Sequence, residues 1–451
     1  MSKLNKSQEL TSEEKLLLKP IEKKPQEKDV ALKTKQIGSL RDSLNRFAKN
    51  KASVVAAIII GILILFTLIG PFLKPYNLHE IDHQSSIQFN FLPPKIPLLE
   101  KLGIFDGSQE VVKNKNFIDQ LPEGIVLETI QEGIEGNQVK VKVDFYKYTN
   151  FIKSYMREDG SIPTRNLTQR QFDEALNRNA VIDIINTYTQ TSTITEDGVS
   201  TTVTEQMYIV RIDLFKFALN QSTDDTYFWF GTMHDARDLF PILWEGARLS
   251  LSLALLISTI NIIIGIILGA LAGYYGGTFD LIFDRIVDIL AALPLIAIIT
   301  LLIIRYGTQV WVVIAGFIVT GWLGAYARTR MQFYRFKNRE YVLAARSLGA
   351  NDRRIMFKHI LPNAIGTLVT TFSLAIPAFI ASEAVYSYLG IIDYGSAVGV
   401  GQLLSFGQRY MTLAPHMLVI PAVYIGILML SFNLFGNGLR DAFNTSLRGS
   451  D

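Results

Sequence analysis

Residues 52–73 read ASVVAAIIIGILILFTLIGPFL, an apolar run without a charged side chain. A helix needs about 20 residues to cross the hydrocarbon core of a bilayer, so this run is long enough to span a membrane. Five more apolar segments of spanning length follow, near residues 248–272, 286–304, 309–326, 365–388 and 415–436. Hydrophobic residues make up 49% of the 451 residues, and the sequence predicts an all-α polytopic membrane protein with about six transmembrane helices.

Basic residues are concentrated on two segments that flank the predicted spans. One group precedes the first span and consists of Lys33, Lys35, Arg41, Arg46, Lys49 and Lys51. The other lies between spans four and five and consists of Arg328, Arg330, Arg335, Lys337, Arg339, Arg346, Arg353, Arg354 and Lys358. Because loops rich in Lys and Arg stay in the cytoplasm, we expect both groups, both termini and the C-terminal tail of residues 437–451 to be cytoplasmic.

The N-terminal region divides into two parts ahead of the first span. Residues 1–36 are rich in Lys, Glu and Gln and predict a disordered cytoplasmic tail. Residues 37–51 predict an amphipathic helix in the membrane interface, or alternatively an ordinary charged flank, from apolar residues at helical spacing, Ile37, Leu40, Leu44 and Phe47. The first span ends in Gly70-Pro71 rather than in a small-residue cleavage pattern, so we expect it to remain as an anchor.

A long polar insertion, residues 74–240, separates the first span from the helical core of residues 241–436 and is large enough for a domain. Residues 138–146 alternate in period two, as a strand does, and residues 191–216 hold two Thr- and Val-rich runs around Asp197-Gly198, as in a hairpin. Residues 169–185 have a helical pattern. We expect a small extracytoplasmic α+β domain that contacts a surface partner or caps the core.

The insertion also contains His79-Glu80-Ile81-Asp82-His83, which fits the HExxH spacing of zinc metalloproteases. No long helix presents the two histidines on one face, because the segment lacks an apolar helical pattern and soon reaches Pro93-Pro94. The chain has no cysteine, which excludes thiolate metal ligands, and its net charge of +3 does not favour nucleic acid as a partner. We predict no metal and no cofactor.

The loop between spans four and five, residues 327–363, contains a compact helical element. Residues 340–349 read EYVLAARSLG and place apolar side chains at i, i+3, i+4 and i+7, namely Tyr341, Ala344, Ala345 and Leu348. Gly349 can end this helix in the left-handed conformation. Asn351 or Asp352 can cap a second short helix, which we expect to end at Pro362. Such an element is typical of a docking site for another protein.

Prolines and one carboxylate are candidates for the pathway or its gate. Pro294, Pro377 and Pro421 lie inside spans three, five and six, where each can bend its helix, although packing kinks without a transport role are equally compatible with the pattern. Glu383, one turn before Ser387, is the ionisable residue that we expect to line or gate the pathway.

Two further patterns concern packing. Asp288 has Arg285 as a candidate partner in the headgroup region. Small residues recur every four positions along span two, at Gly265, Gly269 and Gly273, so we expect another helix to approach closely there.

The helical element resembles the EAA loop of ATP-binding-cassette importer permeases, and the surrounding sequence resembles the C-type integral membrane subunit of dipeptide and oligopeptide permeases. The resemblance covers the first span and residues 229–451. Its motifs are Trp229-Phe-Gly-Thr232, Gly246-Ala-Arg-Leu-Ser250, Ala272-Gly-Tyr-Tyr-Gly-Gly277 with Asp280, Tyr326-Ala-Arg328, the segment 340–363, Asn433-Leu-Phe-Gly436 and Gly438-Leu-Arg-Asp-Ala442.

The resemblance implies a bacterial type I importer permease that forms half of the translocation pathway and couples to a cytoplasmic ATPase. Residues 340–362, here named the coupling segment, would insert into a groove of that ATPase through Glu340, Tyr341, Ala344, Ala345, Leu348, Gly349, Leu361 and Pro362. Two positions depart from the family's motif: Leu343 stands where the motif has glutamate, and His359 stands where it has isoleucine.

The resemblance also implies partners. They are a homologous second permease subunit, two cytoplasmic ATP-binding subunits, an extracytoplasmic peptide-binding lipoprotein and a peptide substrate. The chain itself has no Gly-x-x-x-x-Gly-Lys-[Ser/Thr] loop, so we do not expect it to be an enzyme. Two other classes remain open on the residues alone: a secondary transporter driven by an ion gradient, and a non-transporting receptor whose insertion binds a ligand.

Overall fold

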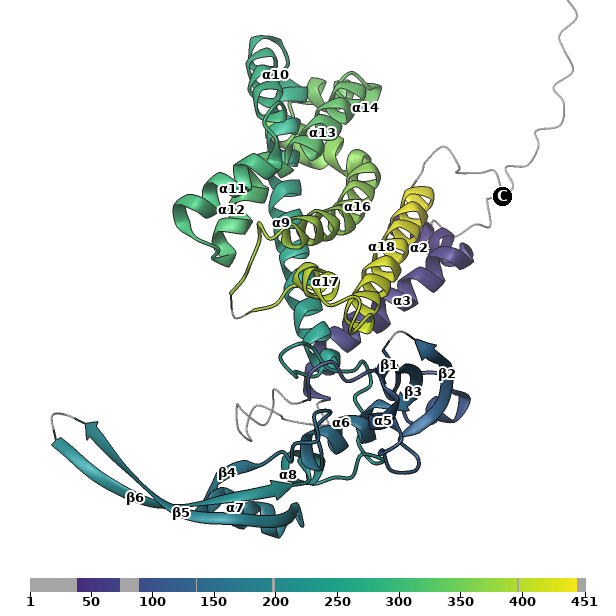
Figure 1. The fold of residues 1–451 in the computed structure, drawn as a ribbon. Coiled ribbons are helices and arrows are strands. Elements are labelled where there is room, and N and C mark those ends of the chain that lie inside the picture. Colours follow the sequence, from purple (N-terminus) through teal and green to yellow (C-terminus); the bar gives the residue numbers. More distant parts are fainter. Residues whose placement is uncertain (1–38, 74–88, 135, 197–198, 396, 444–451) are drawn as a thin grey trace, which may run out of the picture.

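The structure is a computed structural model that describes residues 39–73, 89–134, 136–196, 199–395 and 397–443. A bundle of long helices forms one part of the molecule, and the insertion with its strands lies at one end of that bundle (Figure 1). The segment that follows α13 lies at the opposite end, where α10 and α14 are labelled (Figure 1). The predicted disordered tail of residues 1–36 and the His79–His83 motif lie outside the described residues.

Five helical segments of the described chain are long and apolar enough to cross a membrane: Lys51–Phe72, Leu239–Tyr275, Val310–Phe336, Leu368–Tyr388 and His416–Phe443. A sixth span is made if the bent pair α10 (Gly277–Ala291) and α11 (Leu295–Tyr306) is counted as one. The helices that contain the five are α3 (Lys51–Ile69) with the 3-10 turn η1 (Gly70–Phe72), α9 (Leu239–Tyr275), α12 (Val310–Gly321) with α13 (Leu323–Phe336), α16 (Leu361–Tyr388) and α18 (His416–Phe443). The prediction of a helical membrane protein with about six spans is confirmed.

The third span is broken, which the apolar run of residues 286–304 did not predict. Helices α10 and α11 meet at an angle of 74° across a short break. Pro294 lies in this break and precedes α11, with extended backbone at φ −65° and ψ 123°. Proline has no N–H to donate, so a helix that reaches it loses a hydrogen bond at this point. Pro294 therefore lies at the bend of span three, in agreement with the prediction that it can bend its helix, and Pro377 and Pro421 lie inside α16 and α18.

Helix α9 packs against α13 through glycines. A Cβ atom at Gly265 would lie 2.5 Å from the Cβ of Ala325, and one at Gly269 would lie 2.6 Å from the carbonyl oxygen of Tyr326. At Gly273 it would lie 2.7 Å from the carbonyl oxygen of Arg330. No side chain fits at these positions, so the backbones of the two helices lie in direct contact, as the spacing of the glycines predicted.

The N-terminal helices pack on the C-terminal one. Helix α2 (Ser39–Lys49) contacts α18, where the rings of Phe47 and Phe435 lie 5.4 Å apart. The Ser53 hydroxyl of α3 donates a hydrogen bond to the Leu434 carbonyl oxygen at 3.3 Å. The helix predicted over residues 37–51 is thus present over the described residues, and its place in the membrane interface stays a prediction. Helix α18 ends at Phe443, inside the predicted tail of residues 437–451.

The insertion is an α+β unit with two antiparallel three-stranded sheets, ordered β1-β3-β2 and β4-β6-β5. The strands are β1 (Ser108–Asn114), β2 (Val126–Ile134), β3 (Gln138–Asp144), β4 (Arg165–Thr168), β5 (Val181–Glu196) and β6 (Val199–Ile212). The short helices are η4 (Glu100–Leu102), α5 (Lys115–Ile118), α6 (Phe145–Ser154), α7 (Gln169–Asn177) and α8 (Leu214–Leu219). The predicted strand is present over residues 138–144, whereas Phe145 and Tyr146 begin α6. Strands β5 and β6 pair as the predicted hairpin, whose Asp197-Gly198 turn lies outside the described residues, and form a long ribbon that extends away from the bundle (Figure 1).

The helix predicted over residues 169–185 is too long. Helix α7 ends at Asn177, and Asn179 has a left-handed backbone with φ 51°. Strand β5 then begins at Val181 and pairs with β6, starting with Val181 opposite Ile212. The β-branched residues of this stretch are suited to a strand, and pairing with β6 overrides the helical spacing.

The insertion is anchored on the helical bundle by hydrogen bonds close to Thr232. The Thr232 hydroxyl accepts from the Leu92 N–H at 2.8 Å and also donates to the Phe89 carbonyl. Its carbonyl oxygen lies 3.1 Å from Nε2 of His416, the first residue of α18. Gln109 of β1 donates to the Leu413 carbonyl at 3.0 Å. Residues far apart in the sequence thus fix the insertion to the start of α18.

Substituting Gly269→Ala should destabilise the subunit, because the added methyl group meets the Tyr326 carbonyl. Overpacking of this kind costs about 1–3 kcal/mol. The matched control is Gly324→Ala on α13, where a Cβ atom has no neighbour within 4 Å, and where alanine should be neutral or stabilising by up to about 1 kcal/mol. Thermal unfolding of the purified subunit in detergent measures both, and equal midpoints for the two variants would contradict the close approach of α9 and α13.

Candidate functional site

The coupling segment is a pair of short helices that runs without interruption into α16. Helix α14 (Glu340–Ser347) ends before Gly349, whose φ of 80° is left-handed as predicted. The Asn351 side chain then caps α15 (Asp352–Arg354) by accepting from the Arg354 N–H at 2.9 Å. A π-helical stretch, η5 (Ile355–Ile360), leads directly into α16, which begins at Leu361.

The predicted helix end at Pro362 is wrong. Pro362 stands in the first turn of α16, where a missing N–H has the smallest cost. The Leu361 N–H donates to the Met356 carbonyl, a π-helical spacing that widens the turn just before the proline. The second half of the coupling segment, from Asp352 onward, is therefore continuous with span five, and the turn at Gly349 separates it from α14.

Helix α14 has an inner and an outer face. Val342 and Ala345 are buried, and Val342 belongs to an apolar cluster with residues of α9, α13 and η5. Tyr341, Ala344 and Leu348 are exposed, and Leu348 is 88% exposed at the tip. The four residues predicted to share one docking face are thus divided: three point outward and Ala345 packs inward.

The other predicted coupling residues lie at the two ends of this element. Glu340 is the exposed first residue of α14, and Gly349 forms the exposed turn after it. Leu361 and Pro362 begin α16. Leu343 is 47% exposed, so the residue at the position of the motif glutamate adds to the outward apolar surface.

Glu383 is enclosed at a junction of three helices. Its carboxylate accepts hydrogen bonds from the Ser250 hydroxyl of α9 at 3.0 Å and from the Ser387 hydroxyl at 3.3 Å. The Ser250 oxygen also accepts from the Val400 N–H, which opens α17 (Val400–Arg409). The side chain of Glu383 is 0% exposed. In this conformation the residue joins α9, α16 and α17 rather than lining an open surface, and gating by Glu383 stays a prediction.

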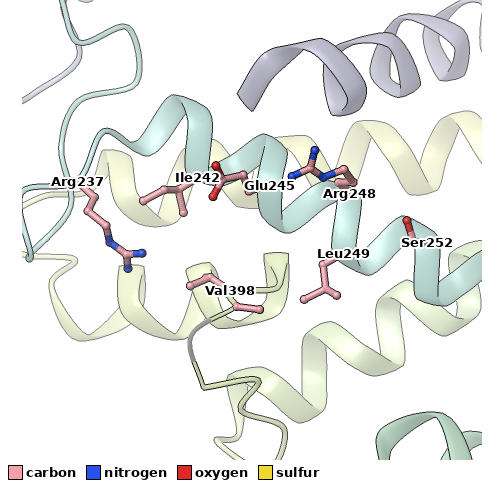
Figure 2. A pocket seen from close by; sticks show the side chains of 8 residues that line it. Arg237, Ile242, Glu245, Arg248, Leu249, Ser252 and Val398 are labelled. Atoms are coloured by element: carbon pink, nitrogen blue, oxygen red, sulfur yellow. The ribbon is translucent and has the colours of Figure 1, made fainter. Parts of the chain in front are cut away.

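A pocket of about 400 Å³ lies along the first half of α9. Figure 2 shows the residues that line it from α9, from the chain before it and from the segment before α17. This charged pocket is lined by Arg237, Ile242, Glu245, Arg248, Leu249, Ser252, Ala397 and Val398. Arg237 is paired with Asp235, with 2.5 Å between Nε and Oδ2.

The sequence reasoning missed the charged pocket because it began span two at residue 248. The structure begins α9 at Leu239 and so places Glu245 and Arg248 one turn apart on a helix. The signal was present in the motif Gly246-Ala-Arg-Leu-Ser250, where charged residues flank a glycine that packs against the Val398 carbonyl. Among the residues that the structure describes, no group of three His, Cys, Asp or Glu side chains is placed to hold a metal ion.

Comparison with known proteins identifies the family. Residues 265–449 match the binding-protein-dependent transport system inner membrane component, and residues 39–94 match the N-terminal TM domain of oligopeptide transport permease C. The oligopeptide transport system permease protein OppC of Bacillus subtilis is 39% identical over 220 residues, which cover 49% of this chain and 72% of that protein. The dipeptide transport system permease protein DppC of the same organism is 37% identical over 242 residues, covering 53% and 74%.

A solved structure of the MetNI methionine ABC transporter in an inward-facing conformation aligns with 45% of this chain and 96% of its own, at 19% identity and a TM-score of 0.36. That score is too low to add to the assignment, which rests on the sequence matches. The chain belongs to the binding-protein-dependent transport system inner membrane components, as a C-type permease subunit of the oligopeptide and dipeptide ABC transporters.

Proposed function

We propose that this subunit carries peptides inward across the membrane and that its coupling segment docks on a cytoplasmic ATPase that drives the movement. The observation that supports docking is the outer face of α14. Its apolar tip is exposed, while the inner face of the same helix is packed against the rest of the protein. The peptide substrate follows from the named relatives, which are oligopeptide and dipeptide permeases.

Family membership makes the chain a multi-pass membrane subunit of a bacterial ABC importer, which also has a second permease subunit, ATPase subunits and a substrate-binding protein. We propose two ATP-binding subunits and a peptide-binding lipoprotein as the partners in this case. Family membership argues against the two classes that the residues alone left open, an ion-driven secondary transporter and a non-transporting receptor.

The physical case for docking rests on rigidity as much as on exposure. Single exposed apolar residues are common on protein surfaces and need no explanation. Here Tyr341 and Leu343 stand on the eight-residue helix α14, and Leu348 follows as its C-cap residue. Val342 and Ala345 are buried on the opposite side of that helix. A short helix with a fixed orientation loses little conformational entropy when it enters a groove. Most of the free energy gained by burying its apolar side chains is therefore available for binding.

Charge supports a cytoplasmic position for this end of the molecule. The coupling segment carries exposed arginines that include Arg346, Arg353 and Arg354, and loops rich in Arg and Lys stay inside. The insertion lies at the opposite end of the bundle (Figure 1). We therefore propose that the insertion is extracytoplasmic and that both termini are cytoplasmic.

The proposed mechanism is a change between inward- and outward-facing states. ATP binding draws two ATP-binding subunits together, and the coupling segments move with them. The equilibrium shifts only because the closed ATPase pair binds one permease state more tightly than the other. Since the second half of the coupling segment continues into α16 without a loop, its displacement reaches the membrane helices directly.

The charged pocket is the place on this subunit where we expect peptide to bind. A peptide with free ends carries an ammonium group and a carboxylate, and the pocket offers Glu245 and Arg248 on one side of α9. Ile242, Leu249 and Val398 add apolar surface for side chains of any sequence. Contacts with the peptide ends suit a carrier that does not select one sequence.

Leu348→Gln should weaken docking of the ATPase, because Leu348 loses apolar surface that binding would bury. Full burial of a leucine contributes about 1.5–3 kcal/mol, which corresponds to roughly 10- to 150-fold in affinity. Co-purification of the ATPase and ATP-driven peptide uptake should both fall, with unchanged membrane insertion. The control is Leu102→Gln, a leucine in the insertion with 72% exposure. ATPase recovery equal to wild type for Leu348→Gln would contradict the docking.

Arg248→Ala should raise the KM for uptake of a peptide with a free C-terminal carboxylate. Loss of a hydrogen bond to a charged group costs about 1.5–3 kcal/mol, or at least about tenfold. A peptide amidated at its C-terminus should show a much smaller difference between wild type and variant, which makes it the internal control. Equal changes in KM for both peptides would show that Arg248 does not bind the carboxylate.

A further inference from the structure

Tyr274 lies where α9 meets the coupling segment. It is the second-last residue of α9 and is 8% exposed. Its hydroxyl donates to Oδ1 of Asp352 at 2.5 Å and accepts from Nη2 of Arg346 at 3.3 Å. The guanidinium carbon of Arg346 also lies 5.8 Å from the centroid of the Tyr274 ring. One hydroxyl thus contacts two side chains of opposite charge.

These two side chains belong to different halves of the coupling segment. Arg346 is in the last turn of α14 and Asp352 is the first residue of α15, with the turn at Gly349 between them. A tyrosine hydroxyl can donate one hydrogen bond and accept others, so it can hold both partners at once. Hydrogen bonds to ionised groups are about twice as strong as neutral ones. The contact fixes both halves relative to α9.

Apolar packing places the tyrosine ring independently of its hydroxyl. The ring belongs to a buried cluster that joins α9, α13, α14 and η5, made of Ala270, Tyr274, Phe333, Val342, Ile355, Met356 and Ile360. Loss of the hydroxyl alone should therefore leave the fold in place. The adjacent Tyr275 is 54% exposed and lies outside this cluster, so it provides a matched comparison.

The helices around Tyr274 are bound into one unit. Gly273 is in direct contact with the backbone of α13. Arg330 of α13 holds Asp280 of α10 through two hydrogen bonds, from Nε at 2.6 Å and from Nη2 at 2.8 Å. A further ion pair joins Arg330 to Asp284 at 3.0 Å. A displacement of the coupling segment can therefore be transmitted to α9 through these contacts.

Helix α9 extends this path to the charged pocket. Its 37 residues form one helix of roughly 55 Å, at 1.5 Å a residue. The same helix carries Ser250, which binds Glu383, and lines the charged pocket with Glu245 and Arg248. The route through α9 is separate from the direct continuation of the coupling segment into α16.

We propose that Tyr274 is a positioning residue that transmits the movement of the coupling segment into α9. The proposal rests on the proposed function, since it assigns the residue to ATP-driven uptake. Without the hydroxyl, the segment still docks on the ATPase, but its movement reaches α9 less completely. ATP is then hydrolysed with fewer peptides carried.

The test compares Tyr274→Phe with Tyr275→Phe in the full transporter reconstituted in liposomes. ATP hydrolysis and peptide uptake are measured in the same sample. For Tyr274→Phe we expect ATP hydrolysed per peptide to rise at least about fivefold, the lower end of usual coupling between sites. Co-purified ATPase should equal that of the wild type. For Tyr275→Phe the ratio should not change.

Variants of Asp352 separate the hydrogen bond from other effects. Asp352→Asn keeps an acceptor oxygen for the Tyr274 hydroxyl and should retain most of the coupling, whereas Asp352→Ala should behave like Tyr274→Phe. The double variant Tyr274→Phe with Asp352→Ala should be no worse than either single change, since both remove the same interaction. Additive losses would overturn the proposal.

A wild-type ratio in Tyr274→Phe overturns the proposal, and so does a loss of bound ATPase, which would indicate a role in docking alone. Hydrogen exchange in the isolated subunit gives a readout that needs no transport: amides of α14 and α15 should exchange faster in Tyr274→Phe and not in Tyr275→Phe. Equal exchange in both variants overturns the proposal as well. A wild-type transporter that takes up no peptide on ATP contradicts the proposed function instead, and the exchange result still decides on Tyr274.

Discussion

The contact between the backbones of α9 and α13 is the constraint on which the rest of the structure depends. Three glycines one turn apart leave no space for side chains, so the two helices lie against each other over more than two turns. The paired helices form the surface against which Val342 and Ile355 pack, and this packing buries the inner face of α14. It also joins the coupling segment to the helix that reaches the charged pocket.

Much of the fold could be predicted because the bilayer imposes simple rules. Apolar runs gave the spans, period two gave β3, and the four-residue glycine spacing gave the close helix pair. Each failure has a physical cause. Hydropathy shows an apolar run over span three but does not record the 74° bend at Pro294. Strand β5 begins at Val181 because β6 pairs with it, a long-range contact that overrides local helical spacing.

The sequence predicted where the coupling segment lies in the chain, but it did not predict correctly which side chains of α14 are exposed and which are buried. Helical spacing placed Ala345 beside Ala344 and Leu348, yet a short helix packed on a larger body buries one side, and the buried side is Val342 with Ala345. The charged pocket needs Val398 from a distant segment beside α9, so no local pattern could reveal it. The bonds of Tyr274 likewise join residues more than 70 positions apart.

The central claim is that the coupling segment and α9 move as one body. Because the chain has no cysteine, pairs of single cysteines can carry spin labels without competition. One pair joins Ser347 on α14 to Leu255 on α9, and the other joins Ser347 to Leu430 on α18; both leucines are exposed. Double electron–electron resonance measures the distance between the two spin labels of each pair, with and without ATP. This distance should stay unchanged for the first pair and change for the second. A first distance that changes as much as the second would contradict the account.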